Sequence, residues 1–316
     1  MRADIVVAKD GSGKFKTVNE AVAAAPENSD RRFIIYVKKG VYSENTEIEK
    51  LKTNLTLIGD GSNETILTDN LNFKDGYPIT KSATFATNAK GFMAVDICFR
   101  NTAGPEKEQA VALHVTGDVS VMYRCRIDGY QDSLFADINR QFYRDCYITG
   151  TIDFIFGNAA AVFQNCQIVA RKPLSGQFNV LTAQGRTQRN QTSAFSLQKC
   201  SITASSDLVP TKKTVKTFLG RPWKDFSRVV IMQSFIDDLV DPQGWAPWDN
   251  NTRRLSTLVY KEFENHGPGA DTSNRVTWPG YKAVNDPKEA TKFTVTNLIE
   301  GDLWLNYTGV PYEKGL

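Results

Sequence analysis

The chain has 316 residues, of which 41% are hydrophobic, and a net charge of +3. This length and apolar content suffice for a large hydrophobic core in one or two domains. The small charge, without any run of lysine or arginine, argues against a nucleic-acid-binding protein. No apolar stretch approaches the ~20 residues that a membrane-spanning helix needs, which argues against a membrane protein.

The N-terminus and the glycosylation motifs bear on where the protein acts. Residues Met1–Asp4 lead directly into a strand-like apolar run without a signal peptide, so we expect either a cytosolic protein or the mature form of a secreted one. Several Asn-x-Ser/Thr motifs favour secretion and predict a glycoprotein. Their asparagines are Asn54, Asn63, Asn190, Asn250 and Asn306.

The first expected elements are one short strand and one helix. The apolar run Ile5–Ala8 ends at a turn-forming cluster of glycine, serine and aspartate at residues 9–13. Thr17 and Glu20 then form a T-x-x-E capping box before an alanine-rich stretch, which Pro26 ends. The sequence therefore predicts one amphipathic helix that caps an end of the fold.

After this helix, short apolar runs replace helical periodicity. Examples are Phe33–Val37, Leu55–Ile58 and Phe92–Ile97, and most such runs are bounded by Gly, Asn or Asp. Runs of this length between turn-forming residues are typical of β-strands. We therefore expect an all-β protein.

A pattern of the form apolar-x-x-Cys-x-Ile recurs through the middle of the chain. Successive copies lie 21, 20, 34 and 34 residues apart, and a looser copy with Ile97 in register lies 28 residues before the first. A base period near 21 with insertions predicts a parallel β-solenoid, in which each coil buries its apolar face on the next. A propeller blade would need ~40 residues every time. The Cys position holds Cys125, Cys146, Cys166, Cys200 and, in the last copy, Ser234.

In such a solenoid the four repeat cysteines form a ladder. Neighbouring strands bring Cα atoms to the separation that a disulfide requires, so Cys125–Cys146 and Cys166–Cys200 disulfide bonds could form. The alternative is a stack of buried free thiols that pack as small apolar groups. Cys98 is one residue out of register and is expected to stay free.

The C-terminal region continues the strands weakly. Leu255–Tyr260 is a further strand candidate, and Asp286–Ala290 predicts a short helix with proline at its first position. No linker or low-complexity segment interrupts the chain. We therefore expect a single domain, with solenoid coils over about residues 32–262 and a C-terminal tail, residues 263–316, packed on the solenoid.

Two aspartates occupy equivalent positions in neighbouring copies of the repeat. Asp132 and Asp153 are 21 residues apart, so the solenoid places them on strands ~4.8 Å apart. They could be turn-forming residues bonded to backbone N–H groups, or could share a cation. However, apolar residues follow both, which is unusual after a turn. Strand alternation there predicts that Phe154 and Phe156 share one face.

A carboxyl pair of this kind has chemical uses. Its pKa values should split, so that one group is an acid and the other a base or nucleophile. A retaining glycosidase, with carboxyls ~5–5.5 Å apart, is compatible with this spacing. Gln131 precedes Asp132, and Gln109 lies one coil upstream, where amides could stabilise an oxyanion. Arg221 could hold a carboxylate bidentately and keep it ionised.

Three tryptophans follow in the same part of the sequence. Trp223, Trp245 and Trp248 could form the apolar walls of a sugar-binding cleft, although scattered aromatic residues more often belong to a core.

Five segments occur in the order Gly40–Glu44, Gln109–Ala112, Gln131–Leu134, Asp153–Gly157 and Leu219–Trp223. They resemble the signature segments of pectin methylesterases, most closely the plant-type catalytic domain, and the resemblance covers nearly the whole chain. It implies a right-handed parallel β-helix that hydrolyses methyl esters of galacturonan and needs no cofactor or metal. Two departures are Ser133, where the family usually has Thr, and the lack of the Phe that many plant members have near Thr80.

The resemblance also implies roles for individual residues. Asp153 resembles the nucleophile that attacks the C6 carbonyl, and Asp132 resembles the acid that protonates the leaving methoxide and then activates water. Gln109 and Gln131 resemble the oxyanion donors. Arg221 resembles the group that orients and ionises Asp153, so we expect it to lower the pKa of Asp153. The residues that resemble cleft aromatics are Phe135, Phe156, Trp223 and Trp245.

The implied substrate is methyl-esterified homogalacturonan in the cell wall, and the implied partner is a small helical inhibitor protein. We expect a secreted monomer. Two other functions are considered: a β-helical pectate lyase or polygalacturonase, which would cleave the polymer, and a non-catalytic relative that binds pectin or an inhibitor.

Overall fold

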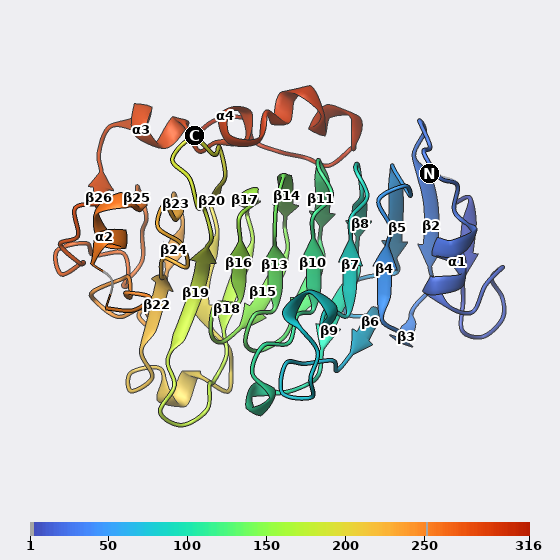
Figure 1. Ribbon diagram of the computed structural model, residues 1–316, viewed down its shortest axis with the longest axis horizontal. Coiled ribbons are helices and arrows are strands. Elements are labelled where there is room, and N and C mark those ends of the chain that lie inside the picture. Colours follow the sequence, from blue (N-terminus) through green and yellow to red (C-terminus); the bar gives the residue numbers. More distant parts are fainter. Residues whose placement is uncertain (1–2, 251) are drawn as a thin grey trace.

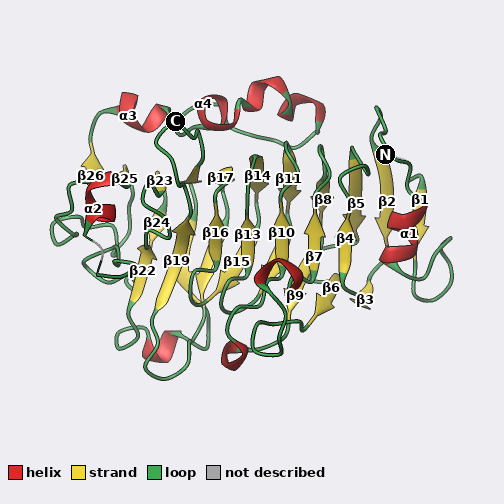
Figure 2. Ribbon diagram, in the orientation of Figure 1, coloured by secondary structure: helices red, strands yellow, loops and turns green. Residues whose placement is uncertain are grey.

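The computed structural model describes residues 3–250 and 252–316. They form an elongated solenoid whose coils stack side by side from the N-terminal to the C-terminal end (Figure 1). Neighbouring strands within each sheet run parallel. The helices lie at the ends of the solenoid or outside its sheets (Figure 2). The all-β, parallel solenoid predicted from the repeat is therefore confirmed.

Three sheets form the walls of the solenoid, and we name them A, B and C. Sheet A contains, in spatial order, β1 (Ile5–Val7), β2 (Phe33–Val37), β5 (Leu55–Gly59), β8 (Met93–Val95), β11 (Ser120–Tyr123), β14 (Arg140–Arg144), β17 (Ala160–Gln164), β20 (Ala194–Gln198), β23 (Arg228–Met232), β25 (Val259–Phe263) and β26 (Tyr281–Val284). Sheet B contains β3 (Gly40–Ser43), β6 (Thr65–Asp69), β9 (Cys98–Asn101), β12 (Arg126–Asp128), β15 (Tyr147–Gly150), β18 (Gln167–Ala170), β21 (Ser201–Ala204) and β24 (Phe235–Ile236). Sheet C contains β4 (Thr46–Ile48), β7 (Phe85–Thr87), β10 (Leu113–Val115), β13 (Leu134–Ala136), β16 (Ile155–Gly157), β19 (Asn179–Gln184) and β22 (Thr217–Gly220).

The register of the strands follows the sequence repeat. Met122 pairs with Tyr143, and Tyr143 pairs with Phe163. The same register continues to Leu197 and then to Ile231. The isoleucines that end each repeat align in the same way in sheet B. The insertions that lengthen some coils include two loops between sheet B and sheet C, at residues 171–178 and 205–216.

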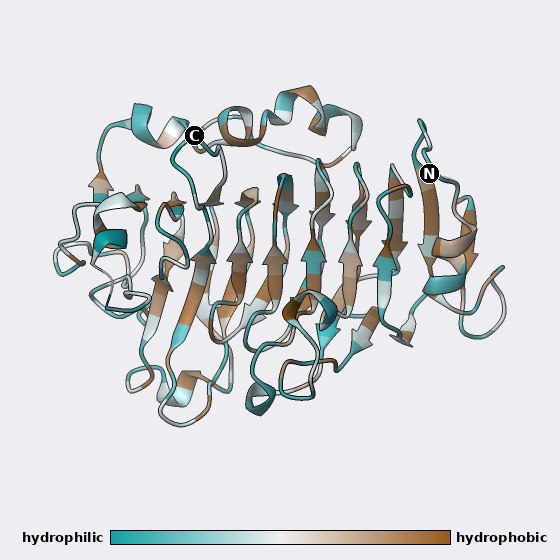
Figure 3. Ribbon diagram, viewed as in Figure 1, coloured by the Kyte–Doolittle hydropathy of each residue, from teal (hydrophilic) through white to brown (hydrophobic). Residues whose placement is uncertain are grey.

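The interior of the solenoid is apolar, as the brown strand segments in Figure 3 indicate. Ile127, Ile148, Ile168 and Ile202 stack within it and are fully buried. Burial of an aliphatic side chain of this size contributes about 1.5–3 kcal/mol. Each coil contributes one isoleucine to this stack. These side chains are buried only because neighbouring coils pack against one another.

The cysteine ladder is present, and of the two alternatives, disulfide bonds or free thiols, the structure has free thiols. All five cysteines are buried free thiols. Each ladder thiol donates to a backbone carbonyl of the preceding coil, as Cys146 Sγ does to Met122 O at 3.3 Å and Cys166 Sγ to Tyr143 O at 3.4 Å. The thiols therefore pack as small buried groups. Cys98 pairs with Arg126 in the sheet, one step off the ladder, and is free as predicted.

The predicted N-terminal helix is α1 (Val18–Ala24), and its capping box is formed. The Thr17 side chain accepts from the N–H of Glu20, and the Glu20 carboxylate accepts from the N–H of Thr17. Glu44 accepts from two further N–H groups of the first turn, at 3.0 and 2.9 Å. Val18 and Ala21 are buried against the end of the core, so the helix closes the solenoid.

The C-terminal region differs from the expectation in one place. The predicted strand Leu255–Tyr260 begins as a short helix, α2 (Arg253–Thr257), and only its end enters strand β25. The predicted helix after Asp286 is α3 (Pro287–Thr291), and the Asp286 side chain caps it by accepting from the Lys288 N–H. A further helix, α4 (Val295–Ile299), packs on the outer face of sheet A in an apolar cluster.

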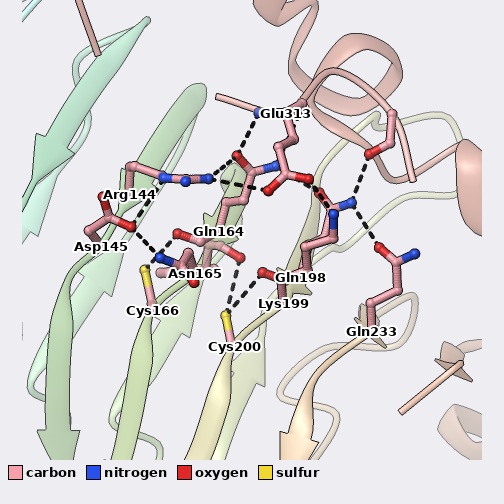
Figure 4. Close-up of polar contacts among 12 residues, drawn as sticks. Arg144, Asp145, Gln164, Asn165, Cys166, Gln198, Lys199, Cys200, Gln233 and Glu313 are labelled. Carbon is pink, nitrogen blue, oxygen red and sulfur yellow. Dashed lines mark hydrogen bonds and ion pairs between the residues drawn. The ribbon is translucent and has the colours of Figure 1, made fainter. Parts of the chain in front are cut away.

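The last residues of the chain bind to a row of glutamines on sheet A (Figure 4). Gln164 donates to Glu313 O at 3.0 Å and accepts from Glu313 N at 2.9 Å. Gln198 donates to Gly315 O at 2.8 Å. Lys199 forms an ion pair with Glu313. The C-terminal segment is thus held on the solenoid by side chains of two successive coils.

Short 3-10 helices occur in the connections, and no helix among residues 3–250 and 252–316 has the length and apolar character to cross a membrane. The 3-10 helices are η1 (Ile79–Lys81), η2 (Pro105–Lys107), η3 (Val209–Thr211), η4 (Gly301–Leu303) and η5 (Leu305–Tyr307).

Candidate active site

The outer face of sheet C carries a row of stacked rings. His114, Phe135 and Phe156 occupy the same rung on successive strands. The ring centroids of His114 and Phe135 are 4.5 Å apart, and those of Phe135 and Phe156 are 4.3 Å apart. Ala86 and Ala183 continue the row on either side. This row forms an apolar floor outside the solenoid core.

A cavity of about 270 Å³ lies over one end of this floor. All five residues predicted to be catalytic line it, together with two of the four predicted cleft aromatics, Phe156 and Trp223. Phe135 is not among the lining residues; it lies beside Phe156 on the neighbouring strand, and the two rings are stacked. The lining residues are Ile79, Gln109, Gln131, Asp132, Asp153, Phe156, Ala183, Arg221, Trp223 and Trp248.

The prediction that Trp245 is a cleft residue is wrong. Trp245 is fully buried in the solenoid, where its ring packs 4.3 Å from that of Tyr260 and its Nε1 donates to Glu262 at 3.2 Å. A β-bridge between Gly220 and Trp245 directs this side chain inward. Trp248, three residues later, takes the place in the cleft wall.

Both aspartates have left-handed backbone conformations, with φ of 63° at Asp132 and 51° at Asp153. Asp tolerates this region better than most residues other than Gly. Phe154 precedes β16 (Ile155–Gly157), so it lies outside the strand whose alternation was used for the prediction. Phe154 and Ile155 both lie in the core, whereas Phe156 lies on the outer floor, so the prediction that the two phenylalanines share a face is wrong.

The two carboxyl groups are buried, with Asp132 6% and Asp153 5% exposed. Arg221, which directly follows β22, binds Asp153 through two parallel hydrogen bonds: Nε to Oδ1 at 2.8 Å and Nη2 to Oδ2 at 2.6 Å. Its guanidinium also lies 4.3 Å over the ring of Trp248. A planar, bidentate contact of this kind fixes the orientation of the carboxylate.

The hydrogen bonds from Arg221 to Asp153 make the two carboxyl groups differ in pKa. Burial raises the pKa of Asp132 well above its ordinary value, and the charge of Asp153 raises it further, while Arg221 opposes both. Burial also raises the pKa of Asp153, and the two hydrogen bonds from Arg221 oppose that rise. Arg221 lowers the pKa of Asp153, as expected, but desolvation outweighs the arginine, so the net shift is upward. The arrangement favours an ionised Asp153 beside a protonated Asp132.

Two amide side chains enter the cavity from neighbouring coils. Gln131 lies in the turn between β12 and β13, and Gln109 precedes β10 on the coil before. The hydrogen bond from Ala110 N to Gln131 O, at 3.2 Å, links these two segments. Gln109 Oε1 is buried without a hydrogen-bond partner among the described residues. Unsatisfied buried polar atoms are rare in folded proteins and mark places where a ligand group is expected.

One wall of the cavity depends on a glycine. Trp223 approaches the backbone of Gly185 so closely that a Cβ at that position would lie 2.6 Å from the indole ring. Trp223 then packs edge-on to Phe156, with 6.0 Å between ring centroids. Ile79 and Ala183 also line the cavity and were missed by sequence reasoning. Their side chains carry no chemical signal, and only the strand register could have found Ala183.

The fold and this cavity define a class of protein: a parallel β-helix with a buried carboxyl pair, one member of which is held by an arginine, in an aromatic-walled cleft. The sequence model of the pectinesterase family, described as "Pectinesterase", matches residues 4–302. The chain belongs to this family.

Relatives agree with this assignment. The chain is 64% identical over 314 residues to "Pectinesterase/pectinesterase inhibitor 18" of Arabidopsis thaliana, an alignment that covers 99% of this chain and 56% of that protein. The chain thus spans a little more than half the length of that relative.

Two solved structures are also similar. The structure titled "Pectin methylesterase from Carrot" has a TM-score of 0.99 and 52% identity, with 100% of this chain and 99% of that chain covered. A pectin methylesterase described as a complex with a hexasaccharide has a TM-score of 0.78 and 28% identity, with 95% and 97% covered. The fold is therefore the right-handed parallel β-helix that was predicted.

Proposed function

We propose that this protein is an esterase that removes methyl groups from galacturonate units of cell-wall pectin, releasing methanol and leaving pectate. The observation that carries the proposal is the carboxyl pair in the cleft: Arg221 holds Asp153 bidentately, and Asp132 is buried beside it. Family membership and the likeness to the carrot enzyme support the choice of substrate.

In the first half of the proposed reaction, the Asp153 carboxylate attacks the C6 carbonyl of the ester. The developing oxyanion accepts hydrogen bonds from the amide groups of Gln109 and Gln131. The C–O bond to methoxide then breaks, and Asp132 gives its proton to the leaving oxygen, so that methanol departs. The galacturonate acyl group is left bound to Asp153. A raised pKa suits Asp132 to this step, because the group must carry a proton near neutral pH.

In the second half, Asp132 is a carboxylate and accepts a proton from a water molecule. The resulting hydroxide attacks the acyl carbon, and the bond to Asp153 breaks. The product leaves as the free acid and loses its proton to solvent water, which gives galacturonate with one carboxylate more than the substrate had. Asp153 is then again a carboxylate, and Asp132 again carries its proton. Arg221 stabilises the negative charge on Asp153 whenever it is the leaving group.

The aromatic walls supply binding surface for sugar rings. Phe156, Trp223 and Trp248 present apolar faces to the cavity, and Phe135 stacks against Phe156 from the neighbouring strand. Ile79 lies next to Thr80, where the family resemblance leads one to expect a Phe nearby. We propose that contacts on this side of the cleft are correspondingly smaller.

We further propose that the protein acts outside the cell, as a single-domain monomer. Asn63, Asn190 and Asn250 are exposed and suited to carry carbohydrate. The Nδ2 groups of Asn54 and Asn306 donate to Ser29 O and Asp302 O, both at 2.8 Å, so glycosylation at these two positions is not expected. The double name of the Arabidopsis relative, a pectinesterase and pectinesterase inhibitor, supports an inhibitor domain or protein as a partner that covers the cleft.

A methanol assay on highly methylated pectin tests the proposal. We expect methanol and free carboxylates to appear in equal amounts while the viscosity of the polymer does not fall. A fall in viscosity would instead indicate a polygalacturonase, and ultraviolet absorbance from unsaturated chain ends would indicate a lyase. Absence of all three signals would favour a non-catalytic relative.

A further inference from the structure

A second and larger cavity lies on sheet B, around the corner of the solenoid from the cleft. Its volume is about 610 Å³, against about 270 Å³ for the catalytic cavity. The turn between β12 and β13 separates the two: Tyr130 lines the larger cavity, and Gln131 lines the catalytic one. We call the larger cavity the sheet B groove. The lining residues that matter here are Arg100, Arg126, Asp128, Tyr130, Tyr147 and Arg171.

Two arginines of the groove share one carboxylate. Arg100 donates from Nε and Nη2 to Asp128 at 3.2 and 3.1 Å, and Arg126 donates from Nε to both oxygens of Asp128 at 2.9 and 2.8 Å. The Asp128 side chain is only 8% exposed, whereas those of Arg100 and Arg126 are 36% and 30% exposed. The anion therefore lies deep, and the guanidinium groups face the groove with one positive charge in excess.

The third arginine has neutral partners. Arg171 donates to Gly129 O at 3.0 Å and to the Tyr130 hydroxyl at 2.7 Å, and its guanidinium lies 3.7 Å over the ring of Tyr130. This stacking fixes the cation in place before any ligand arrives. Asp207 lines the groove too, where it accepts from the Ser205 hydroxyl.

The lining of the groove thus carries a net positive charge, with three guanidinium groups against the carboxylates of Asp128 and Asp207. Two tyrosine rings, Tyr130 and Tyr147, stand among these cations, and Arg126 lies 4.2 Å over the ring of Tyr147. Guanidinium groups held in this way match planar carboxylates, and aromatic surface nearby suits the apolar faces of a sugar ring.

We propose that the sheet B groove binds unesterified galacturonate, the product of the reaction. Carboxylates of a de-esterified segment bind Arg100 and Arg171, and its sugar rings lie against the tyrosines. The methyl ester of the substrate has no charge, so the groove distinguishes processed from unprocessed polymer. This inference rests on the proposed function, which names the product.

The position of the groove gives this binding a consequence. A de-esterified segment held on sheet B keeps the rest of the same polymer close to the cleft, because only the turn that carries Gln131 lies between them. Tethering of this kind raises the effective concentration of neighbouring ester groups.

Calorimetric titration with a short unesterified galacturonate oligomer tests the proposal, because this ligand binds without being turned over. Two variants remove single cations: Arg100→Gln, which leaves Asp128 paired with Arg126, and Arg171→Gln. Each is expected to weaken binding about tenfold, the usual effect of losing one charge-assisted hydrogen bond. Melting temperatures verify that both variants are folded, since Arg171 also supports the turn at Tyr130.

Two control variants locate the binding. Arg31→Gln removes a cation that is paired with Asp4 and 72% exposed, outside the groove, and is expected to leave the dissociation constant unchanged. Trp223→Ala alters the catalytic cleft and is expected to leave most of the oligomer binding in place. Loss of binding in Trp223→Ala but not in the two groove variants would overturn the proposal, as would equal affinity for polyglutamate of the same charge.

The outcome is separable from that of the methanol assay. Methanol release with unaltered oligomer binding in both groove variants would reject the groove and keep the esterase. Arginine-dependent oligomer binding without methanol release would reject the esterase and keep the groove as a site for acidic galacturonan.

Discussion

Two rows of polar side chains on this solenoid differ in how completely they are hydrogen-bonded within the protein. On sheet A, Gln164 and Gln198 are fully buried, and the amide of Gln164 is saturated. It donates to Gln198 and Glu313, and it accepts from Glu313 and Arg144. The C-terminal segment covers this row and supplies the missing partners (Figure 4).

Beside sheet C, the corresponding polar side chains have fewer hydrogen-bond partners within the protein. Gln109 Oε1 has no partner among the described residues, and Asp132 is buried beside a second carboxyl group, which raises its pKa. Both rows arise because stacked coils place similar side chains on neighbouring strands. A row that another segment covers adds stability, whereas a row that remains uncovered retains bonding capacity for a substrate.

The largest expected effect is that of Asp153→Asn on methanol release. The amide is a poor nucleophile, so we expect the rate to fall at least about 10⁴-fold, as when other covalent nucleophiles are removed. A matched control is Asp96→Asn, since Asp96 also has a left-handed backbone, with φ of 58°, and also binds an arginine, Arg124. Asp96→Asn should keep its activity. Activity within tenfold of wild type in Asp153→Asn would remove Asp153 from the nucleophile role.

The next effect concerns the amide donors. Gln131→Ala and Gln109→Ala should each lower kcat about 10²–10³-fold, the range measured for oxyanion donors elsewhere. KM should change little, because the oxyanion exists only in the transition state. The exposed Gln188→Ala is the control. A rise in KM with kcat unchanged would instead assign these amides to ground-state binding.

A smaller effect is expected on the pH dependence of the rate. The proposed reaction needs Asp153 ionised and Asp132 protonated, so the profile should be bell-shaped. Burial raises the pKa of Asp153, so the acid limb should lie above the ordinary aspartate pKa of 3.8; the alkaline limb should follow Asp132, whose pKa is raised further. Arg221→Gln removes an influence that lowers both pKa values, and both limbs should therefore move to higher pH.

A control for this profile is Arg124→Gln, which removes a different arginine that binds a carboxylate, that of Asp96. Its limbs should coincide with those of the wild-type protein. Limbs that stay fixed in Arg221→Gln would show that groups other than the two aspartates govern the profile.

The sequence predicted the register of the coils well, because residues at equivalent positions of the repeat pair on neighbouring strands. Met122, Tyr143 and Phe163 pair as the repeat requires, and the offset of 21 residues places Asp132 beside Asp153. The segments around these aspartates also carry the resemblance to the family. Both successes rest on spacing, which a solenoid converts directly into position.

The sequence did not predict features that depend on local backbone conformation or on burial by segments distant in the chain. Phe154 precedes strand β16, so the expected alternation does not extend from Phe156 to Phe154. One β-bridge turns Trp245 into the core. The net pKa of Asp153 depends on how much burial competes with Arg221, and burial is a property of the assembled cleft.

The smallest expected effect concerns the row on sheet A, Gln164 and Gln198, which the C-terminal segment covers. Gln198→Ala removes the acceptor of Gln164 and the donor to Gly315. Gly315 is exposed and can bond to water instead, whereas Gln164 is fully buried and loses one hydrogen bond. A buried group without its partner costs about 1–3 kcal/mol, so the melting temperature should fall by a few degrees. Methanol release per folded molecule should remain at the wild-type level, because the covered row lies on sheet A and the cleft lies on sheet C.

Thermal denaturation, with Gln188→Ala as the control, measures the expected fall in melting temperature. A variant with normal melting but reduced methanol release would contradict the separation of the two rows, since it would show that coverage by the C-terminal segment acts on the cleft through the coils between them.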